Sequence, residues 1–262
     1  MWQWILLKMI TVFAGLNGKI ESGDFFMKKA LVVFSGGQDS STCLYYAVKN
    51  YDAVYTIGFK YGQRHEIELE CRKDFIETLK AFDREAKEKL IEDKVVDMLS
   101  LKNLTDSALT KDDAEYVMDE KNSLPTSFVP GRNLIFLCYA ASYAYSVGAD
   151  TIISGVGQAD YSGYPDCRES TLKALETAIN LGMESSIRLV SPLMHLTKGE
   201  TFKLAYDLGG DEFVKMIVEK THTCYEGTHN TLHEWGYGCG KCPSCLLRKK
   251  GYEEYLKLRE KL

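Results

Sequence analysis

Short apolar runs alternate along this chain with longer amphipathic stretches. Residues 30–34, Ala-Leu-Val-Val-Phe, form a continuous apolar run that ends at Ser-Gly-Gly, which is typical of a buried parallel strand. Alternating strands and helices favour right-handed crossovers and a doubly wound, mainly parallel α/β sheet. The same pattern predicts further strands at 54–59, 93–99, 151–154 and 187–190, and helices at 40–49, 66–82, 132–147, 169–181 and 198–208.

The strand ends indicate where a ligand would bind. In doubly wound sheets, ligands bind beyond the carboxyl ends of the strands. We therefore expect the loops that begin near Ser35, Tyr61, Gly155 and Ser191 to lie along one edge of the sheet. Between residues 100 and 130 the periodicity gives way to Asn, Asp, Ser, Lys and Pro, which predicts a long surface loop.

Composition and charge narrow the class of protein. A chain of 262 residues that is 45% hydrophobic is long enough to bury a substantial core. Its net charge of -5 gives no general attraction to nucleic acid, so we expect no nucleic-acid partner. Residues 1–26 are too interrupted by polar residues to span a membrane, and we interpret them as a disordered extension or an over-extended start. We expect an ATP-binding α/β domain at 27–210 and a helical zinc-binding region at 211–262.

The segment Ser35-Gly36-Gly37-Gln38-Asp39-Ser40-Ser41 joins the first strand to the first helix. Free backbone N–H groups and the positive end of a helix dipole make such a turn an anion site, and Asp39 is a candidate partner of Mg²⁺. The loop lacks the lysine and the spacing of a kinase-type phosphate loop, which disfavours transfer of a γ-phosphoryl group. The alternative is a Gly/Ser turn in which the acid only caps the helix. The predicted nucleotide-binding residues are Phe34, Ser35, Gly36, Gly37, Gln38, Asp39, Ser40, Ser41, Thr42, Cys43 and Leu44.

A cysteine cluster lies near the end of the chain. Cys239, Cys242 and Cys245 are separated by two-residue gaps, and Cys224 can complete a tetrahedral Zn²⁺ site. Four protein ligands leave no open position, so this zinc would be structural. An iron–sulfur cluster is the alternative, and nearby histidines are alternative ligands: His222, His229 and His233. The remaining cysteines are interpreted as small buried apolar residues: Cys43, Cys71, Cys138 and Cys167.

The Ser-Gly-Gly-x-Asp-Ser loop resembles that of the ATP-pyrophosphatase superfamily, whose members have an adenine nucleotide α-hydrolase-like fold and cleave ATP between the α and β phosphates. Together with the cysteine cluster, four further segments resemble the 7-cyano-7-deazaguanine synthase family of queuosine biosynthesis, from about Met27 to the C-terminus. These segments are 61–65 (Tyr-Gly-Gln-Arg-His), 128–133 (Phe-Val-Pro-Gly-Arg-Asn), 160–168 (Asp-Tyr-Ser-Gly-Tyr-Pro-Asp-Cys-Arg) and 191–194 (Ser-Pro-Leu-Met).

The resemblance implies a cytoplasmic homodimeric ligase that uses ATP to convert 7-carboxy-7-deazaguanine and ammonia into the nitrile through an activated carboxylate and an amide. We expect AMP and pyrophosphate as products, with ADP and phosphate as the alternative. Rival functions are a tRNA-thiolating or amidotransferring enzyme with the same loop, and a non-catalytic zinc-binding module.

Individual roles follow from the resemblance and each has a structural alternative. Asp39, Ser40 and Arg132 are candidate catalytic residues, and Arg132, with Arg248, would neutralise charge that develops on ATP. Arg132 could instead serve only as the first residue of a helix. His65 is a further candidate for a functional role, but it could serve only to order its loop. The candidate substrate residues, which could alternatively pack or pair within their loop, are Asp160, Tyr161, Tyr164, Asp166 and Arg168.

Overall fold

The computed structural model describes residues 27–62, 67–105, 107–110, 116–119, 124–158 and 163–260. Its centre is a five-stranded sheet with the order β3-β2-β1-β6-β7, in which every neighbouring pair is parallel. This confirms the predicted parallel α/β class. The order of a doubly wound sheet reverses between β1 and β6, so the loops that follow these strands flank the expected ligand crevice. The strands are β1 (Lys29–Val33), β2 (Ala53–Lys60), β3 (Leu90–Asp97), β6 (Thr151–Ser154) and β7 (Arg188–Val190).

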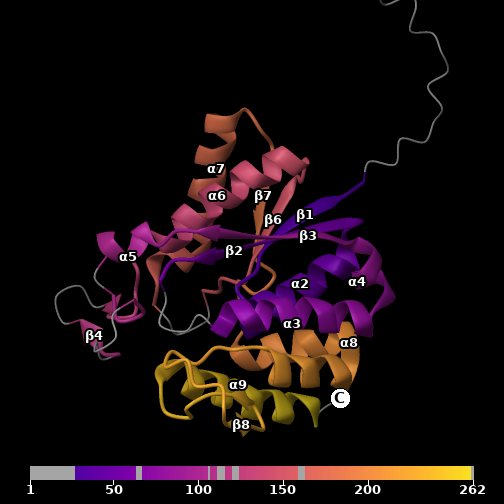
Figure 1. The fold of residues 1–262 in the computed structure, drawn as a ribbon, viewed down its shortest axis with the longest axis vertical. Coiled ribbons are helices and arrows are strands. Elements are labelled where there is room, and N and C mark those ends of the chain that lie inside the picture. The colour runs from indigo at the N-terminus through magenta and orange to yellow at the C-terminus, as the bar shows by residue number, and fades with distance from the viewer. Residues whose placement is uncertain are drawn as a thin grey trace, which may run out of the picture.

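Helices cover both faces of the sheet (Figure 1). On one face lie α2 (Gln38–Asn50), α3 (Ile67–Phe82) and α4 (Arg84–Lys89), with α8 (Lys198–Lys220) and α9 (Pro243–Arg259) packed beyond them. The other face carries α6 (Arg132–Val147) and α7 (Glu169–Met183).

A hydrophobic core lies on each face of the sheet, and strand β1 contributes to both, because successive side chains of a strand point to opposite faces. Ala30 and Val32 are fully buried in the core beneath α2 and α8, whereas Leu31 is fully buried in the core beneath α6. Burial on both faces explains why this strand is a continuous apolar run without alternation.

The last helix of the α/β part is longer than the sequence pattern predicts. The expected helix ended at residue 208, before Gly209-Gly210, but α8 continues to Lys220 across a kink at Gly210, which has non-helical φ/ψ values of 67° and -162°. Helix resumes there because Phe213 and Ile217, one turn apart, are fully buried in the core.

Several short elements were also missed. Helix α4 begins at the cap Asp83, whose carboxylate accepts a hydrogen bond from the Glu85 N–H at 2.8 Å. Within the expected loop at 100–130, the described residues include α5 (Ser100–Leu104) and the hairpin of β4 (Met118–Asp119) with β5 (Leu124–Pro125). Between α8 and α9 lies a second hairpin, β8 (Leu232–His233) with β9 (Gly236–Tyr237).

Arg248, in α9, is 1% exposed and joins the C-terminal region to α8. Its guanidinium donates to the carbonyl oxygens of Ile217 (2.8 Å) and Thr221 (3.4 Å), which are among the last carbonyls of α8. The hydrogen bonds thus give this arginine a helix-capping role, where the sequence had suggested charge neutralisation at ATP. No helix in the described ranges is long and apolar enough to cross a membrane.

Candidate functional site

The loop between β1 and α2 is held by its own hydroxyl groups. Ser35 Oγ lies 3.0 Å from Ser40 Oγ and accepts a hydrogen bond from the Gly37 N–H at 3.2 Å, while Ser40 Oγ donates to the Gly37 carbonyl at 3.1 Å. Gly36 has a φ of +94°, and a Cβ there would lie 2.5 Å from the backbone oxygen of Glu68. Only glycine fits at this position, because the loop passes so close to α3.

Several polar groups around the start of α2 have unmet hydrogen-bonding capacity. Gln38 is 1% exposed, and within the described part of the chain neither its amide nitrogen nor its amide oxygen has a partner. The same holds for Asp39 Oδ1 and the hydroxyl oxygens of Ser41 and Ser154. Ser154 ends β6, and a Cβ on the next residue, Gly155, would lie 3.0 Å from the Ser40 nitrogen. Buried polar atoms without partners are rare in folded proteins, so this cluster at the sheet's reversal point suits a polar ligand.

A lysine from the opposite end of the α/β part lies beside the loop. Lys198 Nζ is 2.5 Å from Asp39 Oδ2, with the two side chains 12% and 28% exposed. Lys198 is the first residue of α8, after the capping box formed by Thr197 and Glu200. The loop itself has no lysine, and the fold supplies one from α8. The capping box could have located the helix start in the sequence, but not its position beside Asp39.

A second group of side chains lies where β2 ends and α6 begins. Arg132, at the start of α6, donates through Nη1 to the Tyr61 hydroxyl at 3.1 Å. Burial opposes the charge on Arg132, but the neighbouring Tyr61, Tyr164 and Asp166 hold its pKa above the ordinary value. Arg132 therefore both opens α6 and stays cationic although it is half-buried.

The candidate substrate residues have different positions. Tyr164 is buried, and its hydroxyl lies 2.7 Å from Ser127 Oγ. Asp166 is also buried and accepts a hydrogen bond from the Asn133 N–H at 3.1 Å, so it orients the first turn of α6. Arg168 is exposed at the start of α7. Three sequence candidates lie outside the described residues: Asp160, Tyr161 and His65.

Two ionisable residues near Arg132 were missed in the sequence. Burial raises the pKa of Glu68 to about 8, although Arg132 and Arg72 act in the opposite direction. A carboxyl group with such a pKa exchanges a proton near neutral pH. Burial, with a hydrogen bond to Tyr164, also raises the pKa of Tyr225 well above its ordinary value. Tyr225 directly follows a cysteine of the terminal cluster, so the C-terminal region contributes to the site.

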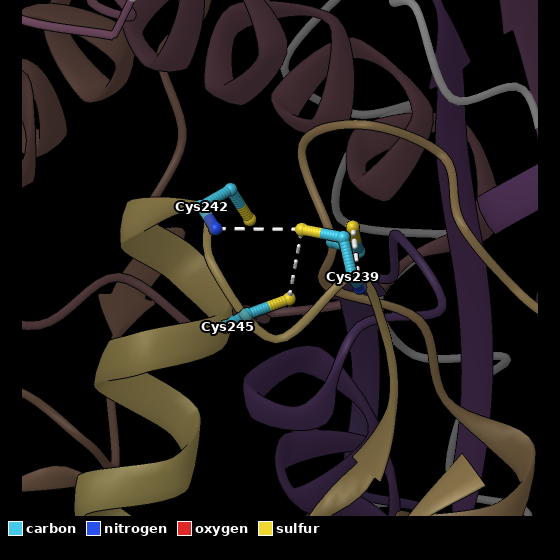
Figure 2. Close-up of side chains that lie close together, drawn as sticks. Cys239, Cys242 and Cys245 are labelled. Carbon is cyan, nitrogen blue, oxygen red and sulfur yellow. Dashed lines mark hydrogen bonds between the residues drawn. The ribbon is translucent and has the colours of Figure 1, made fainter. Parts of the chain in front are cut away.

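The terminal cysteines form one cluster (Figure 2). The sulfur atoms of Cys224, Cys239, Cys242 and Cys245 all lie within 4.8 Å of one another, and those of Cys239 and Cys245 are 3.9 Å apart. Four ligands at Zn–S distances of about 2.3 Å would be separated by ~3.8 Å, so the cluster has the dimensions of a tetrahedral metal site.

The neighbouring histidines have other partners. His222 Nε2 lies 3.0 Å from the Cys224 carbonyl oxygen, and His233 Nε2 lies 3.0 Å from the Gly238 carbonyl oxygen. Among the described residues, the group able to hold a metal consists of the four cysteines. Burial lowers the pKa of His222 to about 4, so its imidazole is neutral at neutral pH.

Comparison with known proteins gives consistent matches over most of the chain. The family model described as "Queuosine biosynthesis protein QueC" matches residues 29–256. A 7-cyano-7-deazaguanine synthase of Paraburkholderia phytofirmans is 50% identical over 230 residues, covering 87% of this chain and 93% of that protein. One from Janthinobacterium sp. is 50% identical over 226 residues, covering 86% and 95%. A solved 4-thiouridine synthetase–RNA complex with bound ATP is 17% identical, with a TM-score of 0.48, covering 88% of this chain and 51% of that one.

Proposed function

Because this chain belongs to the queuosine biosynthesis protein QueC family, we propose that it catalyses the ATP-dependent conversion of 7-carboxy-7-deazaguanine and ammonia into 7-cyano-7-deazaguanine. The observation that carries the proposal is the match over residues 29–256, which includes both the phosphate loop and the cysteine cluster. Family membership confirms the resemblance seen in the sequence and disfavours the tRNA-thiolating and non-catalytic alternatives.

The loop at 35–41 is the proposed site of the ATP phosphates. Gly36 and Gly37 allow close approach of the backbone, and the buried polar atoms of Gln38 and Ser41 offer hydrogen bonds that no described residue uses. Asp39 is the proposed partner of Mg²⁺, and Lys198, already paired with Asp39, would neutralise phosphate charge.

The chemistry requires the same carbon to lose oxygen twice. Joining the substrate carboxylate to AMP releases pyrophosphate and converts a poor electrophile into one with a good leaving group. Ammonia displaces AMP and gives the amide. A second ATP then adenylates the amide oxygen and releases another pyrophosphate. The oxygen departs with AMP while the nitrogen loses its two protons, which leaves the nitrile.

The group around Arg132 is the proposed acceptor side of the site. Its half-buried cationic guanidinium can stabilise charge that develops at the reacting carbon, and Tyr164 offers an aromatic face and a hydroxyl group to the deazaguanine. Glu68, with a pKa of about 8, is a candidate acceptor for the protons released. Asp166 and Arg168 remain proposed substrate residues, together with Asp160 and Tyr161.

The four cysteines are the proposed ligands of a structural Zn²⁺, since a complete tetrahedron of thiolates leaves no position for substrate. We further propose that the enzyme is a cytoplasmic homodimer that acts on free small molecules and uses neither nucleic acid nor membrane.

The proposal is tested by incubating the zinc-replete protein with 7-carboxy-7-deazaguanine, ammonium and ATP, followed by mass spectrometry. We expect the amide and then the nitrile, with AMP and pyrophosphate formed in parallel. Absence of both organic products would refute the assignment. Formation of ADP and phosphate would keep the substrate but replace the adenylation steps.

A further inference from the structure

The residues 221–225, here called the bridging segment, leave the C-terminal end of α8 and lead into the cysteine cluster. On the way they contact the phosphate loop, α9 and the loop that carries Tyr164. These parts are far apart in the sequence, so the bridging segment connects the phosphate loop, the acceptor side of the site and the cysteine cluster.

The contact with the phosphate loop is made by backbone atoms of His222. Its N–H donates to the Gly36 carbonyl at 3.2 Å, and its own carbonyl oxygen lies 3.2 Å from the position that a Cβ on Gly37 would occupy. The bridging segment therefore packs directly against both glycines of the loop.

The imidazole of His222 holds this backbone in place. Its Nε2 lies 3.0 Å from the Cys224 carbonyl oxygen, and since a carbonyl can only accept, Nε2 carries the hydrogen. Its Nδ1 lies 3.1 Å from His229 Nδ1 and acts as the acceptor there. The side chain is fully buried, so these hydrogen bonds are shielded from water.

Helix α9 anchors the segment from the other side. Arg248 donates to the Thr221 carbonyl (3.4 Å) and to Thr223 Oγ1 (3.3 Å), and Ser244 Oγ donates to the Thr223 carbonyl at 2.6 Å. Ser244 lies between two cysteines of the cluster, Cys242 and Cys245. The geometry of the cluster is thereby linked to the backbone that faces the phosphate loop.

At its other end the bridging segment contacts the acceptor side of the site. The side chain of Tyr225 hydrogen-bonds Tyr164, and the Tyr116 hydroxyl donates to the Tyr225 carbonyl at 3.0 Å. Tyr164 in turn bonds Ser127. The position of Tyr164 thus depends on a residue adjacent to Cys224.

We propose that the bridging segment sets the spacing between the phosphate loop and the acceptor side, with His222 as a positioning residue for Gly36 and Gly37 and Tyr225 as a positioning residue for Tyr164. The inference rests on the proposed function for the identity of the two ligands. It predicts that the two residues act on different substrates, although they are only three positions apart.

The test for His222 compares three variants. His222→Gln keeps a donor near the Nε2 position and hence the bond to Cys224, whereas His222→Ala loses it. We expect His222→Ala to raise KM for ATP about tenfold, the scale of one lost hydrogen bond, with KM for the carboxylate substrate within about twofold. His222→Gln should restore most of the ATP affinity. His233→Ala is the matched control, because this imidazole also bonds a backbone carbonyl near the cluster but does not hold the segment.

Tyr225→Phe should have the reverse effect, raising KM for the carboxylate roughly three- to tenfold and leaving KM for ATP unchanged. Tyr252→Phe is its control, since Tyr252 also packs against the cysteine cluster but its ring meets Phe202. Equal changes in both KM values for either variant, or none, would overturn the inference.

A readout that needs no turnover separates this inference from the proposed function. Hydrogen–deuterium exchange of peptides covering residues 34–38 should accelerate in His222→Ala and stay at the wild-type rate in His222→Gln and His233→Ala, with metal content equal in all three. Unchanged exchange in a folded, metal-loaded His222→Ala protein would refute the positioning role. If wild-type protein lacks synthase activity, the proposed function fails while this comparison still decides the inference.

Discussion

Replacing Lys198 by methionine removes the ammonium group paired with Asp39 while keeping much of the apolar stem. The Nζ–Oδ2 distance is 2.5 Å and both side chains are partly shielded from water, at 12% and 28% exposure. Without the lysine, the Asp39 carboxylate would face the proposed position of the ATP phosphates with its charge uncompensated at this contact. Binding and turnover of ATP should therefore both suffer.

The magnitude follows from the kind of contact that is lost. A hydrogen bond that involves a charged partner contributes about 1.5–3 kcal/mol. Since about 1.4 kcal/mol corresponds to a factor of ten, kcat/KM for ATP should fall roughly 10- to 150-fold. The assay is pyrophosphate release at saturating carboxylate substrate and ammonium, with ATP varied.

Lys203 provides a matched control on the same helix. It forms an ion pair with Asp207 at 2.7 Å, one turn further along α8 and at the surface. Lys203→Met should leave kcat/KM for ATP within about twofold of wild type, because exposed pairs contribute little. If Lys198→Met also stayed within twofold, with an unaltered unfolding midpoint, Lys198 would have no role at the phosphates.

Three other predictions concern stability and metal. Gly36→Ala should lower the free energy of unfolding by roughly 1–3 kcal/mol, because φ is +94° and its Cβ would lie 2.5 Å from the Glu68 carbonyl oxygen; an unchanged urea midpoint would contradict this. Cys245→Ser should lose the proposed structural metal, as measured by elemental analysis of the purified protein, and full retention would remove this cysteine from the ligand set. Partial burial tends to raise the pKa of Asp83, but the hydrogen bond from Lys49 holds that pKa below its ordinary value. Asp83→Ala should therefore lower the free energy of unfolding by about 1–2 kcal/mol at neutral pH. This difference from wild type should shrink as the pH falls through the lowered pKa. An equal difference at about pH 7 and about pH 3 would exclude the ion pair as its source.

The sequence by itself determined the features that are local in the chain. The apolar run of β1 and the glycines that follow it predict a strand, a turn and a helix, because these depend on neighbouring residues. Cys239, Cys242 and Cys245 lie within one short run, so their spacing already predicted convergence. The predicted end of α8 at residue 208 was wrong, because Gly209-Gly210 is typical of a helix end, whereas burial of later apolar residues extends the helix.

Only the tertiary structure decided which distant residues join the site. Lys198 and Asp39 are 159 positions apart, and no periodicity or motif in either segment predicts their ion pair. Tyr225 meets Tyr164, and His222 meets Gly36, because α8 and α9 pack against the layer that carries the phosphate loop. The same packing places Arg248 at the end of α8, where its guanidinium donates hydrogen bonds to backbone carbonyls. Seven consecutive residues were enough to predict a phosphate loop, but the lysine beside it, and the segment that links it to the cysteine cluster, depend on how the helical layers pack.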